Sequence, residues 1–176
     1  MNLIIRLLYI ALFSRFRSKQ KVLDRCVTPF RTNLMDLDVL MHMNNGRYLS
    51  IQDLARVDLM SRSGVLPIFN AMGWYPVVVG ETIQFRKSLK LFEKFVIETQ
   101  VIGWTDKDFV LEHVFKKGDL IIAHGYVMSR FLKKKGGPVS IEEVLQAAGI
   151  KERIEMPERV KPWVEHQKLT RAHFTS

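Results

Sequence analysis

The sequence predicts an α+β fold in which an antiparallel sheet of about five strands wraps around one long buried helix. One observation is a helical stretch over residues 46–61 whose apolar residues cover most of its circumference. A second is a series of four strand patterns from residue 75 onward, joined by short turns. A helix that is apolar over so wide an arc is normally buried. Wrapping the sheet around it is the economical way to bury it.

The length and composition indicate one ordinary globular domain. The chain has 176 residues, of which 47% are hydrophobic and 26% are charged, as in typical soluble proteins. The single cysteine, Cys26, excludes an internal disulfide and a multi-thiolate zinc site, and agrees with a reducing compartment. The net charge of +9 permits a nucleic acid, an anionic lipid or a phosphate-rich substrate as partner. Nucleic acid is disfavoured, because no motif combines aromatic and basic residues for that purpose.

The first residues form a separate apolar and basic segment. Residues 1–13 are apolar except for Asn2 and Arg6, and a basic run follows them. As a helix they would span ~20 Å, less than the ~30 Å hydrocarbon core of a bilayer. A secretory signal would carry its positive charges before the apolar run. Two interpretations stay open: a helix lying in a membrane interface, or a helix covering an apolar face of the domain or of a sister subunit.

We divide the chain into three parts on these patterns. Residues 1–22 form the N-terminal helix, residues 23–135 the main domain, and residues 136–176 a helical extension. We expect a cytoplasmic protein that is able to associate with a membrane through residues 1–20.

The long helix is preceded by a loop that carries two carboxylates, Asp36 and Asp38. Asn44 and Asn45 follow at the helix start, where asparagine caps the unpaired backbone N–H groups. Gly64 supplies a stop signal after the helix. The positive end of a helix can hold an anion, or an oxygen that becomes negative during a reaction. The sequence therefore predicts a reactive site at this junction.

The remaining elements follow from local patterns. Residues 24–33 indicate a first strand broken at Pro29, and residues 65–76 are typical of a loop. Ser140 and Glu143 form a capping box for a helix that stops at Gly149, and a last surface helix is expected over residues 159–171. The turns at residues 105–108 and 117–119 predict antiparallel hairpins. The four strands are expected at residues 75–87, 92–104, 109–116 and 120–132.

A long motif adds a resemblance to a known family. The run D-L-D-x-x-x-H-M-N-N-x-x-Y-L, with Ala55-Arg56 behind it, resembles the signature of the hot-dog thioesterases. It is similar to the 4-hydroxybenzoyl-CoA thioesterase group, to bacterial long-chain acyl-CoA thioesterases and to plant acyl-carrier-protein thioesterases. The resemblance is strongest to the group called thioesterase superfamily member six. It covers roughly residues 25–135 and implies the hot-dog fold for the wrapped sheet.

The resemblance implies a role for the junction. Asp38 would be the catalytic carboxylate, which activates a water or attacks the thioester carbonyl itself. The backbone N–H groups near Asn45 and Gly46 would hold the oxyanion. The substrate would be an acyl-CoA or acyl-carrier-protein thioester. No metal or organic cofactor is implied, and coenzyme A enters only as part of the substrate. The family's sites form between subunits, which implies a homodimer or a homotetramer. The alternative is a non-catalytic acyl-CoA or lipid-binding protein of the same fold at a membrane surface.

Other residues near the motif are candidates for substrate binding. His42 would orient Asp38 or donate to the substrate, unless it only satisfies backbone groups. Asn44 and Tyr48 would shape the site, although a cap and a packing residue are the simpler interpretations. Asp36 is interpreted as a loop brace. Asp53 stands on the helix where many family members have Glu, so its carboxylate has a shorter reach.

Charged residues on the strands are the remaining candidates for the site. Glu81 shares the side of the strand that we assign to the core, so it needs a partner or a cavity. Arg86 and Lys87 belong to a basic rim that would hold the phosphates of coenzyme A, although for any single lysine a solvated surface is the better explanation. Glu81, His113 and His124 match no metal-ligand spacing. The far end of the acyl slot is expected at four large side chains: Met60, Phe69, Met72 and Trp74.

Overall fold

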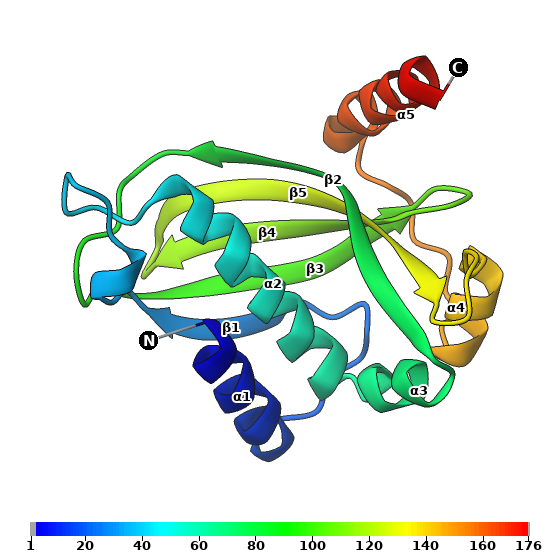
Figure 1. The fold of residues 1–176 in the computed structure, drawn as a ribbon, viewed down its shortest axis with the longest axis horizontal. Coiled ribbons are helices and arrows are strands. Elements are labelled where there is room, and N and C mark those ends of the chain that lie inside the picture. The colour runs from blue at the N-terminus through cyan, green and yellow to red at the C-terminus, as the bar shows by residue number, and fades with distance from the viewer. Residues whose placement is uncertain (1–2, 176) are drawn as a thin grey trace.

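The computed structural model of the chain describes residues 3–175. It contains a five-stranded sheet in the order β1-β3-β4-β5-β2, in which every neighbouring pair is antiparallel. Helix α2 crosses one face of this curved sheet (Figure 1). The predicted α+β arrangement is therefore confirmed. The strands are β1 Cys26–Arg31, β2 Trp74–Phe85, β3 Lys94–Trp104, β4 Phe109–Lys117 and β5 Leu120–Lys133.

Helix α2 (Asn45–Arg62) is the buried rod that the apolar pattern predicts. Tyr48, Ile51 and Ala55 pack with side chains of β3 and β4 under its first half. Leu59 packs in a second cluster under its last turns. The side chain of Asn44 accepts a hydrogen bond from the backbone N–H of Gly46 at 2.9 Å, so Asn44 is the N-cap.

Two small helices close one end of the molecule, and the C-terminal helix contacts the other face of the sheet. Helices α3 (Val65–Ala71) and α4 (Ile141–Ala147) pack into the same apolar cluster as Leu59. The predicted capping box of Ser140 and Glu143 is present at the start of α4. Helix α5 (Lys161–Thr175) packs through Val164 on strand residues that alternate with those facing α2. Short 3₁₀ turns occur at Ser14–Phe16, Leu34–Asp36 and Glu158–Val160.

Two local predictions are wrong. Residues 65–76, expected as a loop, contain α3 and the start of β2. Pro67 is tolerated because it lies in the first turn of α3, where the backbone N–H has no partner in the helix. Strand β1 also continues through Pro29, which pairs with Val96. It is an edge strand, so the missing N–H of proline costs no ladder bond on the open side.

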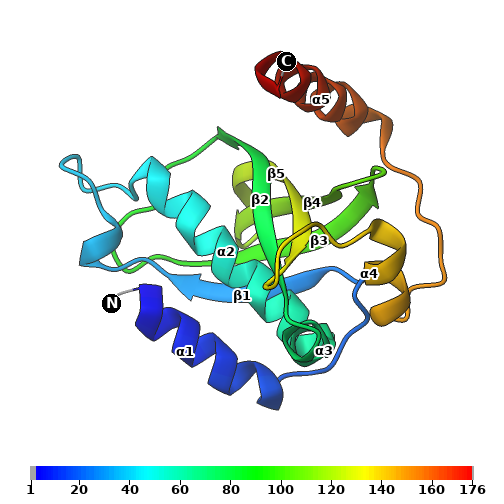
Figure 2. The same cartoon turned by 45° about the vertical axis from the view of Figure 1, so that its right-hand side comes forward.

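Helix α1 (Leu3–Phe13) lies alongside α2 (Figures 1 and 2), with Ile10 buried between them and polar side chains making further inward contacts. Arg6 is 4% exposed and donates to the carbonyl of Arg31 at 3.0 Å and to Asp36 Oδ2 at 2.5 Å. Ser14 Oγ lies 2.6 Å from Ser61 Oγ. The structure therefore shows this segment packed on the domain. None of the helices within residues 3–175 is both long and apolar enough to cross a bilayer.

The buried pair of Arg6 and Asp36 gives a test of this packing. The substitution Asp36→Asn leaves the Arg6 guanidinium buried without its carboxylate, so the free energy of unfolding should fall by ~3–5 kcal/mol. Urea unfolding monitored by circular dichroism measures the loss. Glu165→Gln is the control, because its carboxylate pairs with Lys168 on the exposed side of α5 and should matter little. Equal effects of the two substitutions would contradict the assignment.

Candidate active site

The loop before α2 is a tight hairpin that holds Asp38 at its turn. A bridge between Leu37 and Met43 closes the hairpin, and the N–H of Asp38 donates to the carbonyl of His42 at 2.8 Å. Asp38 Oδ1 accepts from the N–H of Leu40 at 2.9 Å and from that of His42 at 3.4 Å. Its Oδ2 accepts no hydrogen bond within residues 3–175, and the residue is half-buried. One oxygen therefore fixes the carboxylate and the other is available for chemistry.

The amino end of α2 leaves one donor open beside this loop. The N–H groups of Gly46 and Arg47 are both bound to Asn44, at 2.9 Å in each case. The N–H of Asn45 has no acceptor in the described part of the chain, and the residue is exposed. An open N–H at the positive end of a helix is suited to an oxygen that carries negative charge. The Asp38 carboxylate and this donor are seven residues apart.

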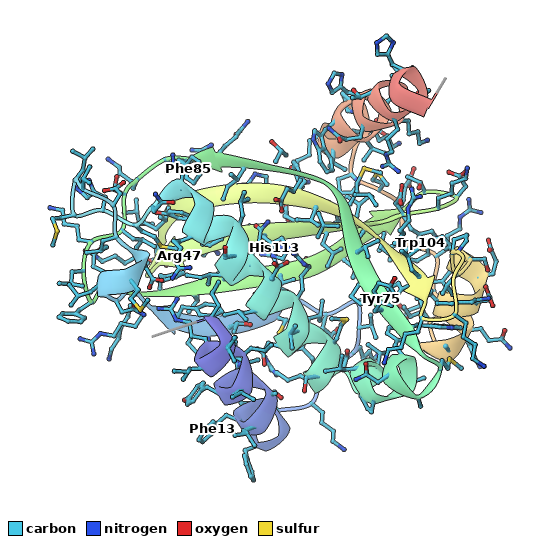
Figure 3. All side chains as sticks on the ribbon, in the orientation of Figure 1. Phe13, Arg47, Tyr75, Phe85, Trp104 and His113 are labelled. Atoms are coloured by element: carbon cyan, nitrogen blue, oxygen red, sulfur yellow. The ribbon has the colours of Figure 1, made fainter. Side chains whose placement is uncertain are left out.

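Asp36 ties the loop to the helix and is a structural residue, as the sequence suggests. Its carbonyl accepts from the N–H of Asn44 at 2.8 Å, and its Oδ2 accepts from the N–H of Asn33 at 2.9 Å. Its other carboxylate oxygen lies 3.5 Å from Nε of Arg47, the residue labelled near the amino end of α2 in Figure 3. The residue is fully buried. The loop and the helix start therefore form one braced unit.

The other motif residues take different places. His42 is half-buried, and its backbone N–H and carbonyl both bond to Asp38. Tyr48 is only 1% exposed, and its ring lies 5.1 Å from that of Phe85 and 5.2 Å from that of Phe115. Burial raises the pKa of the Tyr48 phenol. Within one chain Tyr48 is therefore packed in the core, and its proposed role in substrate binding stays a prediction.

The charged residues of β2 and its end stand apart from the loop. Arg86 and Lys87 are exposed, and their backbone N–H groups both donate to the carbonyl of Ile122. Glu81 lies on the side of β2 that faces α2, as its shared parity with Ile83 and Phe85 predicts, because Ile83 packs on the cluster under α2 and Phe85 contacts Tyr48. Glu81 is exposed, and its Oε2 accepts from the amide of the buried Gln52 at 3.2 Å.

A buried polar network lies between α2 and the sheet. His113, labelled behind α2 in Figure 3, is fully buried. Its Nδ1 lies 3.0 Å from Thr99 Oγ1, and its Nε2 lies 3.3 Å from a guanidinium nitrogen of Arg56. Burial and the neighbouring Arg56 charge lower the pKa of His113 well below its usual value. Burial also lowers the pKa of Arg56 to about 10, although the charge of Glu81 opposes this shift. The imidazole is therefore neutral at pH 7.

The structure places the three candidate metal-binding side chains in separate networks. His113 contacts Thr99 and Arg56, whereas Glu81 contacts Gln52. His124 Nε2 lies 3.0 Å from Glu112 Oε1. Among residues 3–175 no group of three or more His, Cys, Asp or Glu side chains is arranged to hold a metal ion.

An apolar cavity of about 230 Å³ runs along the second half of α2. Asp53 and Arg56 are its charged lining residues, and they form an ion pair with each other. Of the four side chains expected to close a slot, Met60 and Phe69 line this cavity, whereas Met72 and Trp74 do not. The sequence did not locate the cavity, because its walls come from α2, α3, α4 and the sheet. Other apolar wall residues are Val57, Val77, Val101, Phe109, Leu111 and Phe131.

These features place the chain in a known class of proteins. It belongs to the thioesterase-like superfamily, whose family model matches residues 32–164. The chain is 37% identical over 133 residues to Protein THEM6 of Xenopus laevis, a match that covers 74% of this chain and 63% of that protein. The chain thus spans less than two thirds of that relative's length.

Solved structures share the fold. The probable thioesterase YbaW from Escherichia coli superposes with a TM-score of 0.65 at 23% identity, over 71% of this chain and 96% of that one. The structure of BH1999 gentisyl-coenzyme A thioesterase gives a TM-score of 0.62 at 24% identity, over 68% and 98% of the two chains. At these identities the likeness shows the fold alone, and it confirms the predicted hot-dog fold.

The buried imidazole predicts a pH dependence of stability. The folded chain keeps His113 neutral, whereas a histidine in the unfolded chain takes up a proton near its ordinary pKa of 6.5. The contribution of His113 to the free energy of unfolding should therefore be constant above pH ~6.5. As the pH is lowered further, the free energy of unfolding should fall by at most ~1.4 kcal/mol per pH unit. Urea unfolding between pH ~7.5 and ~4.5 measures this slope.

Two variants identify the source of the slope. His113→Gln, which cannot ionise, should flatten it, whereas His166→Gln on the exposed surface of α5 should leave it unchanged. Parallel curves for His113→Gln and the wild type would contradict the assignment. Glu112 acts in a lower pH window, because its hydrogen bond from His124 and its pairing with Arg159 hold its pKa at about 2.

Proposed function

We propose that this protein hydrolyses the thioester bond of a fatty or aromatic acyl-CoA. One observation carries the proposal: a free oxygen of Asp38 and the free N–H of Asn45 occur on one braced loop and helix end. Membership of the thioesterase-like superfamily supports hydrolysis of a thioester as the general reaction. BH1999, named as a gentisyl-coenzyme A thioesterase, is a structural neighbour that acts on a coenzyme A ester.

The two groups would supply the base and the oxyanion donor of the reaction. The thioester carbonyl oxygen accepts from the N–H of Asn45, where the α2 dipole stabilises the developing negative charge. Asp38 removes a proton from a water molecule that attacks the carbonyl carbon, or attacks that carbon itself to form an anhydride that water then hydrolyses. The carbon–sulfur bond breaks, and coenzyme A leaves as its thiol after gaining a proton. The products are the free acid and coenzyme A. Gly46 contributes mainly the tight turn, because its N–H is bound to Asn44.

The cavity supports a site that is shared between two subunits. Tyr48, near the amino end of α2, contacts Phe85 at the end of β2, whereas the cavity is lined by Pro76, Val77 and Val78 near its start. Strand β2 is a free edge of the sheet. If a second copy paired with β2 antiparallel about a two-fold axis, the Phe85 end of each strand would meet the partner's Val77 end. Each Asp38 would then serve the cavity of the other subunit in a homodimer.

The exposed basic residues at the end of β2 complete the proposed substrate contacts. Arg86 and Lys87 follow Phe85 directly and are free to hold the phosphates of coenzyme A through charge-assisted hydrogen bonds. His42 would fix the loop through its backbone bonds to Asp38, and Asn44 would fix the helix end.

Replacement of the proposed base tests the chemistry. Asp38→Asn should lower kcat by at least ~10²-fold, because an amide neither accepts the proton of water nor attacks a carbonyl effectively. Release of free thiol from acyl-CoAs of several chain lengths measures turnover. Asp119→Asn, in the exposed turn before β5, is the matched control and should retain activity. If Asp38→Asn and the wild type turn over equally, Asp38 is not the base. Saturable acyl-CoA binding without turnover in the wild type would favour the non-catalytic alternative.

Mixed dimers test whether the site is shared. Asp38→Asn removes the carboxylate, and Val57→Trp fills the cavity, so each homodimer should be inactive. In a heterodimer of the two, one shared site would contain both the native Asp38 and a native cavity. Random reassembly of equal amounts should then restore about a quarter of the wild-type activity, because half of the dimers hold one intact site of two. A mixture with no activity would show that the carboxylate and the cavity act within one chain.

A further inference from the structure

Helix α1 exposes most of its apolar side chains and buries a charged one, unlike an ordinary surface helix. A helix on a globular domain buries its apolar stripe and exposes its charges. Here the charged Arg6 is 4% exposed and Ser14 is 3% exposed. Ile10 is buried and Leu3 is partly buried, but the other large apolar side chains are turned outward, each between 38% and 63% exposed along the helix: Ile4, Ile5, Leu7, Leu8, Tyr9, Leu12 and Phe13. Figure 3 shows Phe13 pointing away from the body of the protein.

The inward polar contacts fix this orientation. Arg6 and Arg17, at the two ends of the segment, donate to the carbonyls of Arg31 and Val27 on the open edge of β1. The same two guanidinium groups pair with the buried carboxylates of Asp36 and Asp58, at 2.5 Å in each pair. Rotating the helix to bury its apolar face would break these bonds. The buried carboxylates of Asp36 and Asp58 would then lose their pairing with Arg6 and Arg17. The inward contacts of Arg6 and Arg17 therefore fix the apolar face of α1 toward solvent.

The outward face continues into an aromatic and basic end. Tyr9 and Phe13 have ring centroids 4.4 Å apart, and those of Phe13 and Phe16 are 6.4 Å apart. Phe16 is 81% exposed, so this aromatic row contacts solvent along its length. Lys19 and Lys21 follow it and are both exposed. Residues 1–23 contain no acidic residue, and besides the inward-paired Arg6 and Arg17 they contain three basic ones: Arg15, Lys19 and Lys21.

We propose that the outer face of α1 docks the protein on the surface of an anionic lipid bilayer. Aliphatic side chains of one helix face enter the boundary between headgroups and acyl chains. Aromatic rings favour the headgroup level, and the lysines beyond them bind lipid phosphates. The helix lies in the plane of the membrane, since 11 residues rise only ~16 Å. The sheet order favours lipid over a second copy of the chain as the occupant of this face. Helix α1 covers the β1 edge, whereas the subunit contact proposed above uses the opposite edge, β2.

Binding of the full-length protein to vesicles tests the proposal. Wild type should sediment with vesicles of phosphatidylcholine and phosphatidylserine, and more weakly with phosphatidylcholine alone. The double variant Leu8→Glu/Leu12→Glu should bind the mixed vesicles at least about tenfold more weakly, because two charges replace apolar contacts with lipid. Both positions are more than half exposed, so the fold should tolerate the change. Circular dichroism spectra that match those of the wild type check this.

Control variants separate the docking face from general effects of charge. Leu120→Glu/Leu169→Glu adds the same two charges at exposed leucines on β5 and α5, at 48% and 63% exposure, and should reduce binding less. Lys19→Glu/Lys21→Glu should weaken binding to the mixed vesicles by about tenfold or more, at ~1 kcal/mol for each lysine near an anionic surface. It should leave binding to phosphatidylcholine almost unchanged.

Two results would overturn the proposal. One is equal vesicle binding by wild type and the Leu8→Glu/Leu12→Glu variant. The other is a wild type that ignores vesicles while sedimentation velocity shows a larger assembly than for this variant, in which case the face binds a second copy of the chain. Neither result depends on turnover, so the thioesterase proposal stands or falls separately.

Discussion

The burial of α2 inside the curved sheet is the constraint on which the rest of the structure depends. The helix carries buried polar residues as well as apolar ones, and each requires a partner on another element. Gln52 donates to Glu81 on β2, Arg56 lies against His113 on β4, and Asp58 accepts from Thr28 on β1 at 2.7 Å. These three contacts fix the rotation and the axial position of the helix. A sliding or rotating α2 would break them together.

A fixed helix gives a fixed amino end, which is what a reaction at that end requires. The Asn44 cap binds the N–H of Gly46, and Asp36 holds the loop that carries Asp38. Helix α1 contributes through Arg6, whose guanidinium pairs with the same Asp36. Donors that are already oriented in the free protein need no reorganisation when charge develops. The segment proposed to contact lipid and the loop proposed to contact the thioester therefore share one buried carboxylate.

The sequence predicted the parts that depend on local patterns. The long helix, its Asn44 cap, the hairpin series and the capping box of Ser140 all follow from periodicity and turn chemistry. The loop carboxylates and the helix cap predicted a reactive site at this junction, and the family resemblance implied that Asp38 is its catalytic carboxylate. Features that depend on tertiary context were missed. Pro29 reads as a break, and Glu81 as a buried residue, until both strands are known to lie at the edges of the sheet.

The orientation of α1 and the position of the cavity also depend on tertiary context and could not be predicted from local sequence. An apolar run with one arginine does not reveal that the arginine faces inward, because that depends on Asp36 being available behind it. The cavity has walls from residue 22 to residue 150, so no local window contains it. Side chains that line a shared space can be far apart in sequence, and only the fold brings them together.

A structure of the protein bound to an acyl-CoA thioether analogue, in which a methylene group separates the carbonyl from the sulfur, would test the central claim most directly. We predict that the carbonyl oxygen lies within ~3 Å of the Asn45 nitrogen, with Asp38 facing the carbonyl carbon. The acyl chain should enter the cavity bordered by Asp53 and Arg56. A carbonyl bound elsewhere, with Asp38 facing bulk solvent, would contradict the account.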